Sequence, residues 1–464
     1  MSDALRSEVE VLLSEDGCPA CRFVAQAEDR FFRWFAIESH AAPETIERLR
    51  AALGMCPAHT RRLLGGELEP ATLTSVYREV AKTAVARVAA QDPPAACPAC
   101  ASAQFNVNLV LTGVLRGLDD QRLAGRYVEA GGLCLPHLLA AVPTAEPSAL
   151  ELVCHTLAAR LEHSADDMGA LTGLDRDAPT RAIWRARVPD SASAGLPPGG
   201  TIHNLLERLL VDSCPACLRS GQAEREYLVW LVAEQRRHGQ ILTNDPGEVC
   251  PAHLADLAAL DADTGAAASA RTGDRWRSEL RNVSAELALP AARSADRGGR
   301  GSSRRADADL RFRWPRRAAT GTAAPKSSPV DRTDWGPARA GLAGDRLCPI
   351  CRAVAVAQRR ELALLVAALR LPAVGSAYRR AHGLCARHVR ELAEPESAAL
   401  AHRHLAARLG VLSWELEESS RKEAWASRHE PKGPEATAYG RLIAQIDGHA
   451  LMGAPAPVRA EPLS

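Results

Sequence analysis

The chain has 464 residues, a formal net charge of +1 and 46% hydrophobic residues, of which few are aromatic. This length is enough for two or three domains with cores of their own, and the composition is that of a globular protein. The balanced charge gives no overall attraction to nucleic acid or to an anionic membrane. Abundant Ala, Leu and Arg favour helix.

The N-terminal residues 1–6 are polar, and no apolar signal-peptide core follows them. The chain also lacks a run of about 18 apolar residues, so we expect no membrane partner. A chain without an export signal is expected in the cytoplasm. In that reducing compartment, spaced Cys and His residues indicate a metal site more often than a disulfide.

One motif, CPxC followed by Cys-x-x-His, occurs four times. The gap between its two pairs is 34, 33, 32 and 33 residues, and twelve of the thirteen cysteines belong to it. The copies contain Cys18, Cys21, Cys56 and His59; Cys97, Cys100, Cys134 and His137; Cys214, Cys217, Cys250 and His253; and Cys348, Cys351, Cys385 and His388. Cys154 is left over, and its amphipathic surroundings predict a core position.

The residues around each motif predict helices. Pro follows the first Cys, a position that the first turn of a helix tolerates, and a helical apolar period then continues for about five turns. Gly precedes each Cys-x-x-His, as at a helix stop, and a new helix is expected to begin there. Long amphipathic helices are predicted at roughly 70–90, 147–171, 267–288 and 395–420. The fold class is therefore all-α, with four helical modules each held by a Cys3His metal site.

The first module resembles the third, and the second resembles the fourth. Counted from the second Cys, Trp34 of the first module matches Trp230 of the third, and residues 157–161 are identical to residues 405–409. The order is A-B-A-B, which indicates two duplicated halves.

The second half carries an insertion. Cys56 and Cys97 are 41 positions apart, whereas Cys250 and Cys348 are 98 apart, a difference of 57. The extra residues contain thirteen Lys/Arg against six Asp with almost no apolar period, and we expect them to be disordered. The predicted division is 1–175, first half; 176–200, linker; 201–289, third module; 290–346, disordered basic insert; 347–425, fourth module; 426–452, C-terminal turn and helix; and 453–464, tail.

Three thiolates and one imidazole form a standard ligand set of structural zinc, which is four-coordinate and tetrahedral. We therefore predict about four Zn²⁺ per chain, each ligated within its own module, and leave open an exchange of ligands between neighbouring modules. Four protein ligands leave no coordination position for a substrate, which argues against catalysis at the metal. Two other interpretations of the cysteines are a redox-active dithiol, including a sensor that releases zinc, and an iron–sulfur cluster.

The basic insert contains one candidate nucleic-acid-binding stretch. Its residues are Arg311, Arg313, Trp314, Arg316 and Arg317. Basic residues interleaved with an aromatic can contact phosphates and stack on bases. The alternative is a solvated linker in an Arg-rich chain.

The C-terminal stretch supplies a resemblance. Arg421 and Lys422 are followed by Glu430-Pro431-Lys432-Gly433, Glu435, Tyr439 and Gly448. Together with the repeated Cys motifs, this pattern resembles a bacterial protein family that carries CPxC and Cys-x-x-His pairs in helical modules. The resemblance implies a cytoplasmic, zinc-binding helical protein and supplies no activity. The present chain differs in its long insert and in lacking such a segment after the first half.

No Walker A loop, dinucleotide-binding fingerprint, GxSxG or HExxH motif occurs in the sequence. We therefore predict a non-enzymatic scaffold or adaptor that presents helical faces to a protein partner. The two alternatives are a thiol-based redox sensor and a nucleic-acid-binding regulator that uses the insert.

Overall fold

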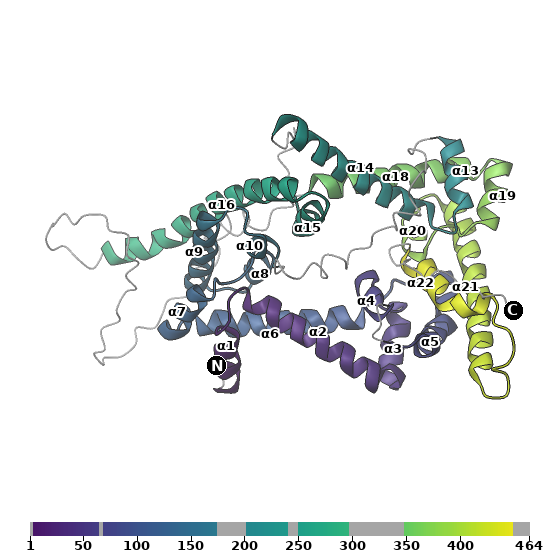
Figure 1. Cartoon of the computed structure of the whole chain (residues 1–464), viewed down its shortest axis with the longest axis horizontal. Helices are drawn as coiled ribbons and strands as arrows, with labels where there is room; N and C mark the ends of the chain where they lie inside the picture. The colour runs from purple at the N-terminus through teal and green to yellow at the C-terminus, as the bar shows by residue number, and fades with distance from the viewer. Residues whose placement is uncertain (1–2, 65–67, 174–200, 240–248, 297–347, 449–464) are drawn as a thin grey trace, which may run out of the picture.

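The computed structural model describes residues 3–64, 68–173, 201–239, 249–296 and 348–448 (Figure 1). Within these ranges the chain forms nineteen α-helices, two short 3-10 helices and no strand, so the predicted all-α class is confirmed. The expected linker at 176–200 lies outside the described residues. So do the insert from residue 297 onward and the tail.

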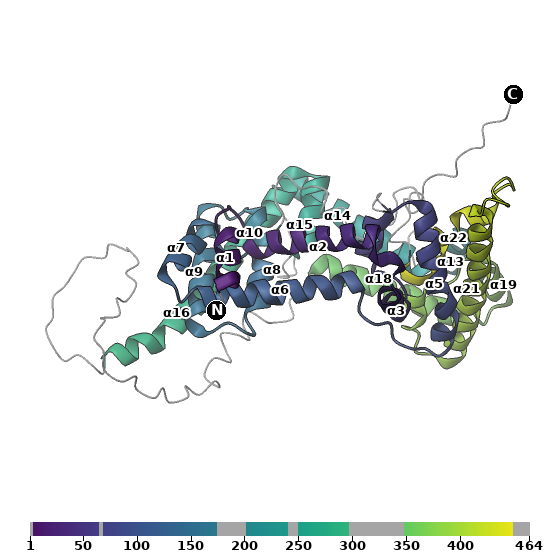
Figure 2. The same ribbon diagram turned by 90° about the horizontal axis from the view of Figure 1, so that it is seen from below.

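Two pairs of long helices form two sides of the molecule (Figure 1). The helices are α2 (Pro19–Ile37), α6 (Pro98–Gly117), α14 (Pro215–His238) and α18 (Pro349–Ala368). Helix α2 packs along α6, and α14 packs along α18. Figure 2 shows α2 and α6 lying side by side from a second direction. Each pair is antiparallel, because the two CPxC starts of a pair belong to different hydrophobic cores.

The helix pairs connect two lobes, one at each end. Lobe 1 contains α1 (Asp3–Leu12), α7 (Gln121–Glu129), α8 (Leu135–Ala141), α9 (Pro147–His163), α10 (Met168–Thr172), α15 (Pro251–Leu260) and α16 (Ala262–Asp296). Lobe 2 contains η1 (Ser39–Ala41), α3 (Pro43–Ala52), α4 (Pro57–Arg62), α5 (Pro70–Ala89), α13 (Ile202–Leu210), α19 (Pro372–Arg380), α20 (Ala386–Val389), α21 (Pro395–Glu423), η4 (Pro434–Thr437) and α22 (Ala438–Asp447).

Each lobe has one core, and both halves of the chain contribute to it. In lobe 1, α9 of the first half packs against α16 of the second, and in lobe 2, α5 packs against α21. Leu157 of α9 and Leu280 of α16 lie in one buried cluster, and Val80 of α5 and Leu409 of α21 lie in the other. Because each core is divided between the halves, removing one half exposes apolar surface in both lobes.

The helix starts follow from the Cys pairs. The first Cys of every pair is an N-cap residue, at Cys18, Cys56, Cys97, Cys134, Cys214, Cys250, Cys348 and Cys385. Proline occupies the first turn of seven of these eight helices, where its missing N–H costs nothing. Before the second pairs, Gly54, Gly132 and Gly383 adopt positive φ values, as the predicted helix stops require.

The predicted long helices are present with two differences. The helix expected over 147–171 is interrupted after His163, because the Asp167 carboxylate accepts a hydrogen bond from the Ala170 N–H and caps a new helix, α10. Helix α16 begins earlier than expected, since Asp261 accepts a hydrogen bond from the Thr264 N–H at 3.0 Å. It continues to Asp296, so the prediction that the disordered insert begins at residue 290 is wrong for 290–296, which extend this helix.

Among the described residues, no single helix is long and apolar enough to cross a membrane. Only the pair α18 and α19 passes such a test of length and composition when taken together, and it is bent by 116° at its junction.

Candidate metal centres

Four clusters, each of three cysteines and one histidine, could hold a metal ion. Site 1 contains Cys18, Cys21, Cys134 and His137; site 2 contains Cys56, His59, Cys97 and Cys100; site 3 contains Cys214, Cys217, Cys385 and His388; and site 4 contains Cys250, His253, Cys348 and Cys351. All sixteen predicted ligands fall in these clusters. Sites 1 and 4 lie in lobe 1, and sites 2 and 3 lie in lobe 2.

The clusters correct the predicted pairing. We expected each CPxC to share an ion with the Cys-x-x-His of its own module, and this is wrong: every CPxC meets the Cys-x-x-His of the neighbouring module. The first two modules exchange ligands with each other, and so do the last two. Every site therefore links two modules.

Helix length explains the exchange. Helix α2 has 19 residues, which at 1.5 Å per residue carries the chain about 28 Å from its CPxC start. Helix α3 has only 10 residues and spans about 15 Å, so the chain reaches Cys56 while still at the far end of α2. The antiparallel helix α6 begins at that end and supplies Cys97 and Cys100 instead.

The ligand atoms in each site are spaced as a single tetrahedral ion requires. In all four sites the histidine Nδ1 faces the cysteines, at 3.2 to 3.6 Å from their Sγ atoms. The distance between one pair of Sγ atoms is 3.6 Å in site 1, 3.5 Å in site 2, 3.8 Å in site 3 and 3.9 Å in site 4. A tetrahedral zinc ion needs about 3.5 Å between sulfur and nitrogen and about 3.8 Å between two sulfurs. A polynuclear iron–sulfur cluster would hold its cysteines farther apart.

The thiols perturb one another strongly. Neighbouring Cys100 and Cys97 lower the pKa of the Cys56 thiol, whereas Cys56 and Cys97 raise the pKa of Cys100. Sites 1, 3 and 4 also contain one thiol of lowered and one of raised pKa. The cause is hydrogen bonding between thiols, together with burial. Neighbouring thiols donate to one thiolate and lower its pKa, while the donating thiol, buried beside that charge, keeps its proton and has a raised pKa. A divalent cation would displace the remaining protons, and the two helix N-termini at each site add further positive potential.

Buried tyrosines hold the second pair of sites 1 and 3. The hydroxyl of Tyr127 accepts a hydrogen bond from the Leu133 N–H at 2.8 Å, and that of Tyr378 accepts one from the Leu384 N–H at 3.2 Å. Both side chains are fully buried, and burial raises the pKa of each phenol. Each bond fixes the loop immediately before the Cys-x-x-His. Each Tyr stands seven residues before its Cys, and this recurrence in the sequence is the signal that could have identified the role.

Glycines close the same two sites. Gly173 follows α10 with φ +71°, and a Cβ there would lie 2.6 Å from the Cys21 Sγ; Gly448 follows α22 with φ +88°, and a Cβ would lie 2.5 Å from the Cys217 Sγ. Any side chain would therefore displace a ligand. Both glycines follow the last described helix of a half, and each lies against the CPxC cysteines of its own half.

The end of α22 also lies near a second site. Thr60, one residue after a site 2 ligand, has its Oγ1 3.5 Å from an Asp447 carboxylate oxygen. Burial and the thiols of Cys56 and Cys385 raise the pKa of Asp447 well above its usual range. Helix α22 packs on α21 and α20 of the fourth module and also on α5 of the first module.

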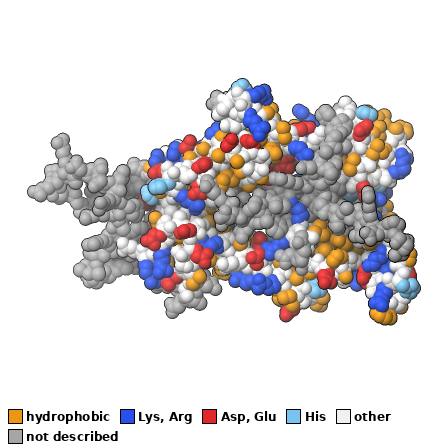
Figure 3. Space-filling view, in the orientation of Figure 1, with side chains coloured by type: hydrophobic (Ala, Val, Ile, Leu, Met, Phe, Trp, Pro, Cys, Tyr) orange, Lys and Arg blue, Asp and Glu red, His pale blue; other side chains and the backbone are white. Residues whose placement is uncertain are grey.

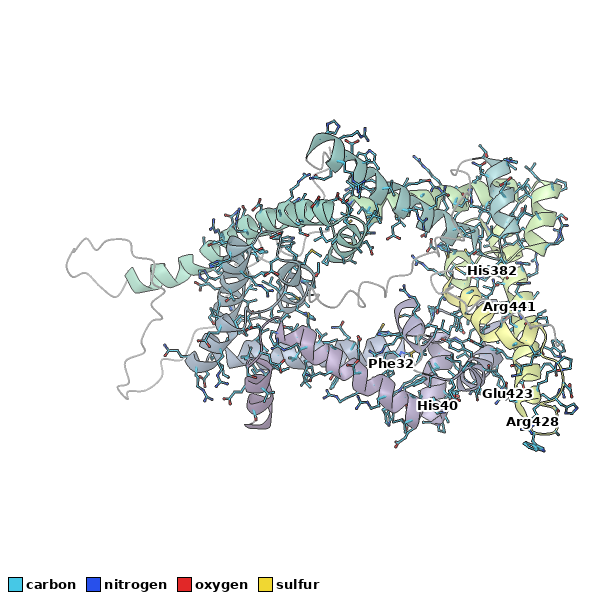
Figure 4. All side chains as sticks on the ribbon, in the orientation of Figure 1. Phe32, His40, His382, Glu423, Arg428 and Arg441 are labelled. Atoms are coloured by element: carbon cyan, nitrogen blue, oxygen red, sulfur yellow. The ribbon has the colours of Figure 1, made fainter. Side chains whose placement is uncertain are left out.

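Ion pairs hold the segment on which the family resemblance rests. The Lys422 Nζ lies 2.8 Å from a Glu435 oxygen, which also accepts a hydrogen bond from the Gly433 N–H at 2.7 Å. Arg441, labelled on α22 in Figure 4, pairs with Glu415 of α21 and donates to the Pro434 carbonyl at 2.6 Å. These contacts dock the segment and include no metal ligand.

Two predictions concern residues outside the metal sites: Cys154 and the candidate nucleic-acid-binding stretch. Cys154 is fully buried in the core of lobe 1, as predicted, and burial raises the pKa of its thiol to about 12. It belongs to none of the four candidate metal sites. The candidate nucleic-acid-binding residues lie outside the described residues; they are Arg311, Arg313, Trp314, Arg316 and Arg317.

Comparison with known proteins finds no matching family model, no matching curated protein and no matching solved structure. The four clusters agree with the repeated Cys3His motifs behind the family resemblance, but no family match supports membership.

Proposed function

We propose that this chain is a zinc-dependent scaffold: four structural Zn²⁺ ions hold a helical frame that presents its faces to a protein partner. The observation that carries the proposal is the exchange of ligands, since every site joins two modules through helix N-termini. Four protein ligands complete the coordination of each ion, as in structural zinc sites. The cytoplasm suits such a protein because thiols stay reduced there.

The energy of metal binding is large enough for this role. Structural zinc contributes about 10–16 kcal/mol in small peptides, against roughly 5–15 kcal/mol for the net stability of a whole domain. Each lobe contains two sites, and in each lobe one site comes from each half. Loss of zinc would therefore loosen both ends of both helix pairs.

The first test is the metal content of protein purified without added metal, with free thiols counted in parallel. About four zinc ions per chain, with twelve thiols that react only after chelation or denaturation, are expected. A visible iron chromophore, or little metal with paired disulfides, would contradict the proposal; the second result would favour the redox sensor.

Exposed aromatic and aliphatic side chains support the scaffold role. Figure 3 shows apolar side chains gathered over α13 and α19, where Ile202, Leu210 and Leu371 are exposed. A groove of about 570 Å³ lies between α14 and α18, with Tyr227 and Trp230 on one wall. Large exposed aromatics are typical of protein interfaces.

A photo-crosslinking residue tests this surface in the full-length protein. Placed at Trp230, it is expected to yield a discrete heterologous adduct in cells. Placed at Arg236, which is exposed on the same helix, it should yield none. Equal labelling at both positions, or adducts at neither, would contradict a docking role for the groove.

A further inference from the structure

A carboxylate contacts the metal-facing histidine of site 4 from behind. The Nδ1 of His253 faces the three cysteines, while its Nε2 lies 2.8 Å from a Glu224 carboxylate oxygen. His253 is 3% exposed, and the Glu224 side chain is 21% exposed. Glu224 lies on α14 and His253 on α15, so the contact also joins two helices.

Sites 2 and 3 differ in this feature. In site 2, at the same count from the CPxC cysteines, Glu28 lies 3.6 Å from the His59 Nε2 and is also 3.8 Å from an Arg62 nitrogen. The interaction there is longer and shared with a cation. In site 3, the Nε2 of His388 is buried with no hydrogen-bond partner in the described part of the chain. The carboxylate contact is therefore shorter at site 4 than at site 2, and the described residues supply none behind His388.

We propose that Glu224 is a positioning residue that makes site 4 bind its metal ion more tightly than the same four ligands would bind it without the carboxylate. The carboxylate accepts a hydrogen bond from the Nε2–H of His253. This bond fixes the tautomer whose Nδ1 lone pair is free to ligate, holds the ring plane, and makes the imidazole a better donor. The inference rests on the proposed function, because it requires an ion at site 4.

Zinc transfer from the full-length zinc-loaded protein to an excess of a chromogenic chelator, followed by the chelator's absorbance, tests this assignment. Glu224→Ala should shift one of the four zinc ions to release that is about 10- to 100-fold faster, the usual effect of losing such a partner. Glu224→Gln keeps an acceptor without the charge and should fall between Glu224→Ala and the wild type. Glu226→Ala is the matched control, since Glu226 is exposed on the same helix and pairs with Arg219 at 3.2 Å.

A second measurement separates positioning from general loosening. In the zinc-loaded wild type, the His253 Nε2 proton should give a slowly exchanging, downfield NMR signal that both Glu224 variants weaken while the Glu226 variant preserves it. Unchanged zinc release in both Glu224 variants would overturn the inference and leave the scaffold proposal intact. A wild-type chain without zinc would overturn both.

A fifth zinc ion per chain would also overturn the inference. The ligand atoms of Glu224, His253 and Asp256 lie within 4.8 Å of one another. A fifth ion would mean that these three groups chelate a cation of their own, with His253 bridging two metals.

Discussion

The short helix before each half's first CPxC pair packs on a long helix of the neighbouring module, and the contact differs between the halves. In the second half, Arg208 and Glu361 form a fully buried pair, with both guanidinium–carboxylate contacts at 2.8 Å. In the first half, counted from the CPxC cysteines, the same positions are Leu12 and Val110, which lie in one buried apolar cluster.

This difference shows that the helix contact does not require charge. A buried ion pair gains in Coulomb energy about what it loses in desolvation, so an apolar pair of similar size serves equally well. The Cys and His ligands, by contrast, are the same in both halves. Side chains that only fill a core can change together, whereas a metal site keeps its donor set.

The largest expected effect comes from breaking metal sites in pairs. Cys18→Ser should reduce zinc from about four to about three per chain, at a cost of several kcal/mol in stability. Adding Cys134→Ser should remove no further ion, because both cysteines belong to site 1, whereas adding Cys56→Ser should remove a second. Metal analysis of the two double variants decides between exchanged and within-module pairing, since the latter predicts the opposite order.

The second largest effect is expected from breaking the buried ion pair of the second half. Glu361→Ala should destabilise the protein by about 3–5 kcal/mol, because it leaves the Arg208 guanidinium buried without its carboxylate. The double variant Arg208→Leu with Glu361→Val copies the first half and should recover most of this loss. Urea unfolding of the wild type, Glu361→Ala and the double variant measures these free energies of unfolding. A double variant no more stable than Glu361→Ala would show that an apolar pair cannot replace the ion pair in the second half.

The glycines that close sites 1 and 3 test whether both halves end in the same way. Gly173→Ala and Gly448→Ala should each lower stability by about 2–3 kcal/mol, the cost of positive φ plus displacement of a cysteine. Gly239→Ala is the control: its φ is +65°, but no atom of the described residues lies within 4 Å of the added Cβ. It should lose only about 1 kcal/mol and keep its zinc. Equal losses in all three variants would count against close contact with the metal ligands.

The smallest effect is expected in the segment found only after the second half. Lys422 and the Gly433 N–H lower the pKa of Glu435 to about 2. The unfolded value is about 4.3, so the carboxylate contributes stability above that pH and loses it as the pH falls toward 2. Glu435→Gln should cost about 1 kcal/mol at neutral pH and flatten the stability curve between roughly pH 4 and 2. An unchanged acid limb in the variant would exclude this contribution.

The sequence by itself determined the helices and the ligands. Cys18 and the seven equivalent cysteines are N-cap residues. In seven of the eight helices a proline occupies the first turn, a position that favours a helix start, and this preference is local. The donor types alone indicate a closed metal site. Tyr127 and Tyr378 each stand seven residues before a Cys in the sequence, but only their hydrogen bonds show what they do.

Only the tertiary structure decided which ligands share an ion and which surfaces form a core. Cys56 is separated from Cys21 by 34 residues and from Cys97 by 40, so spacing along the chain favours neither partner strongly. The direction of α2 decides, because a straight helix carries the chain away from its own start and an antiparallel neighbour brings the other pair to meet it. The contact of Glu224 with His253 and the approach of Gly173 to Cys21 depend on the same packing, which no local pattern specifies.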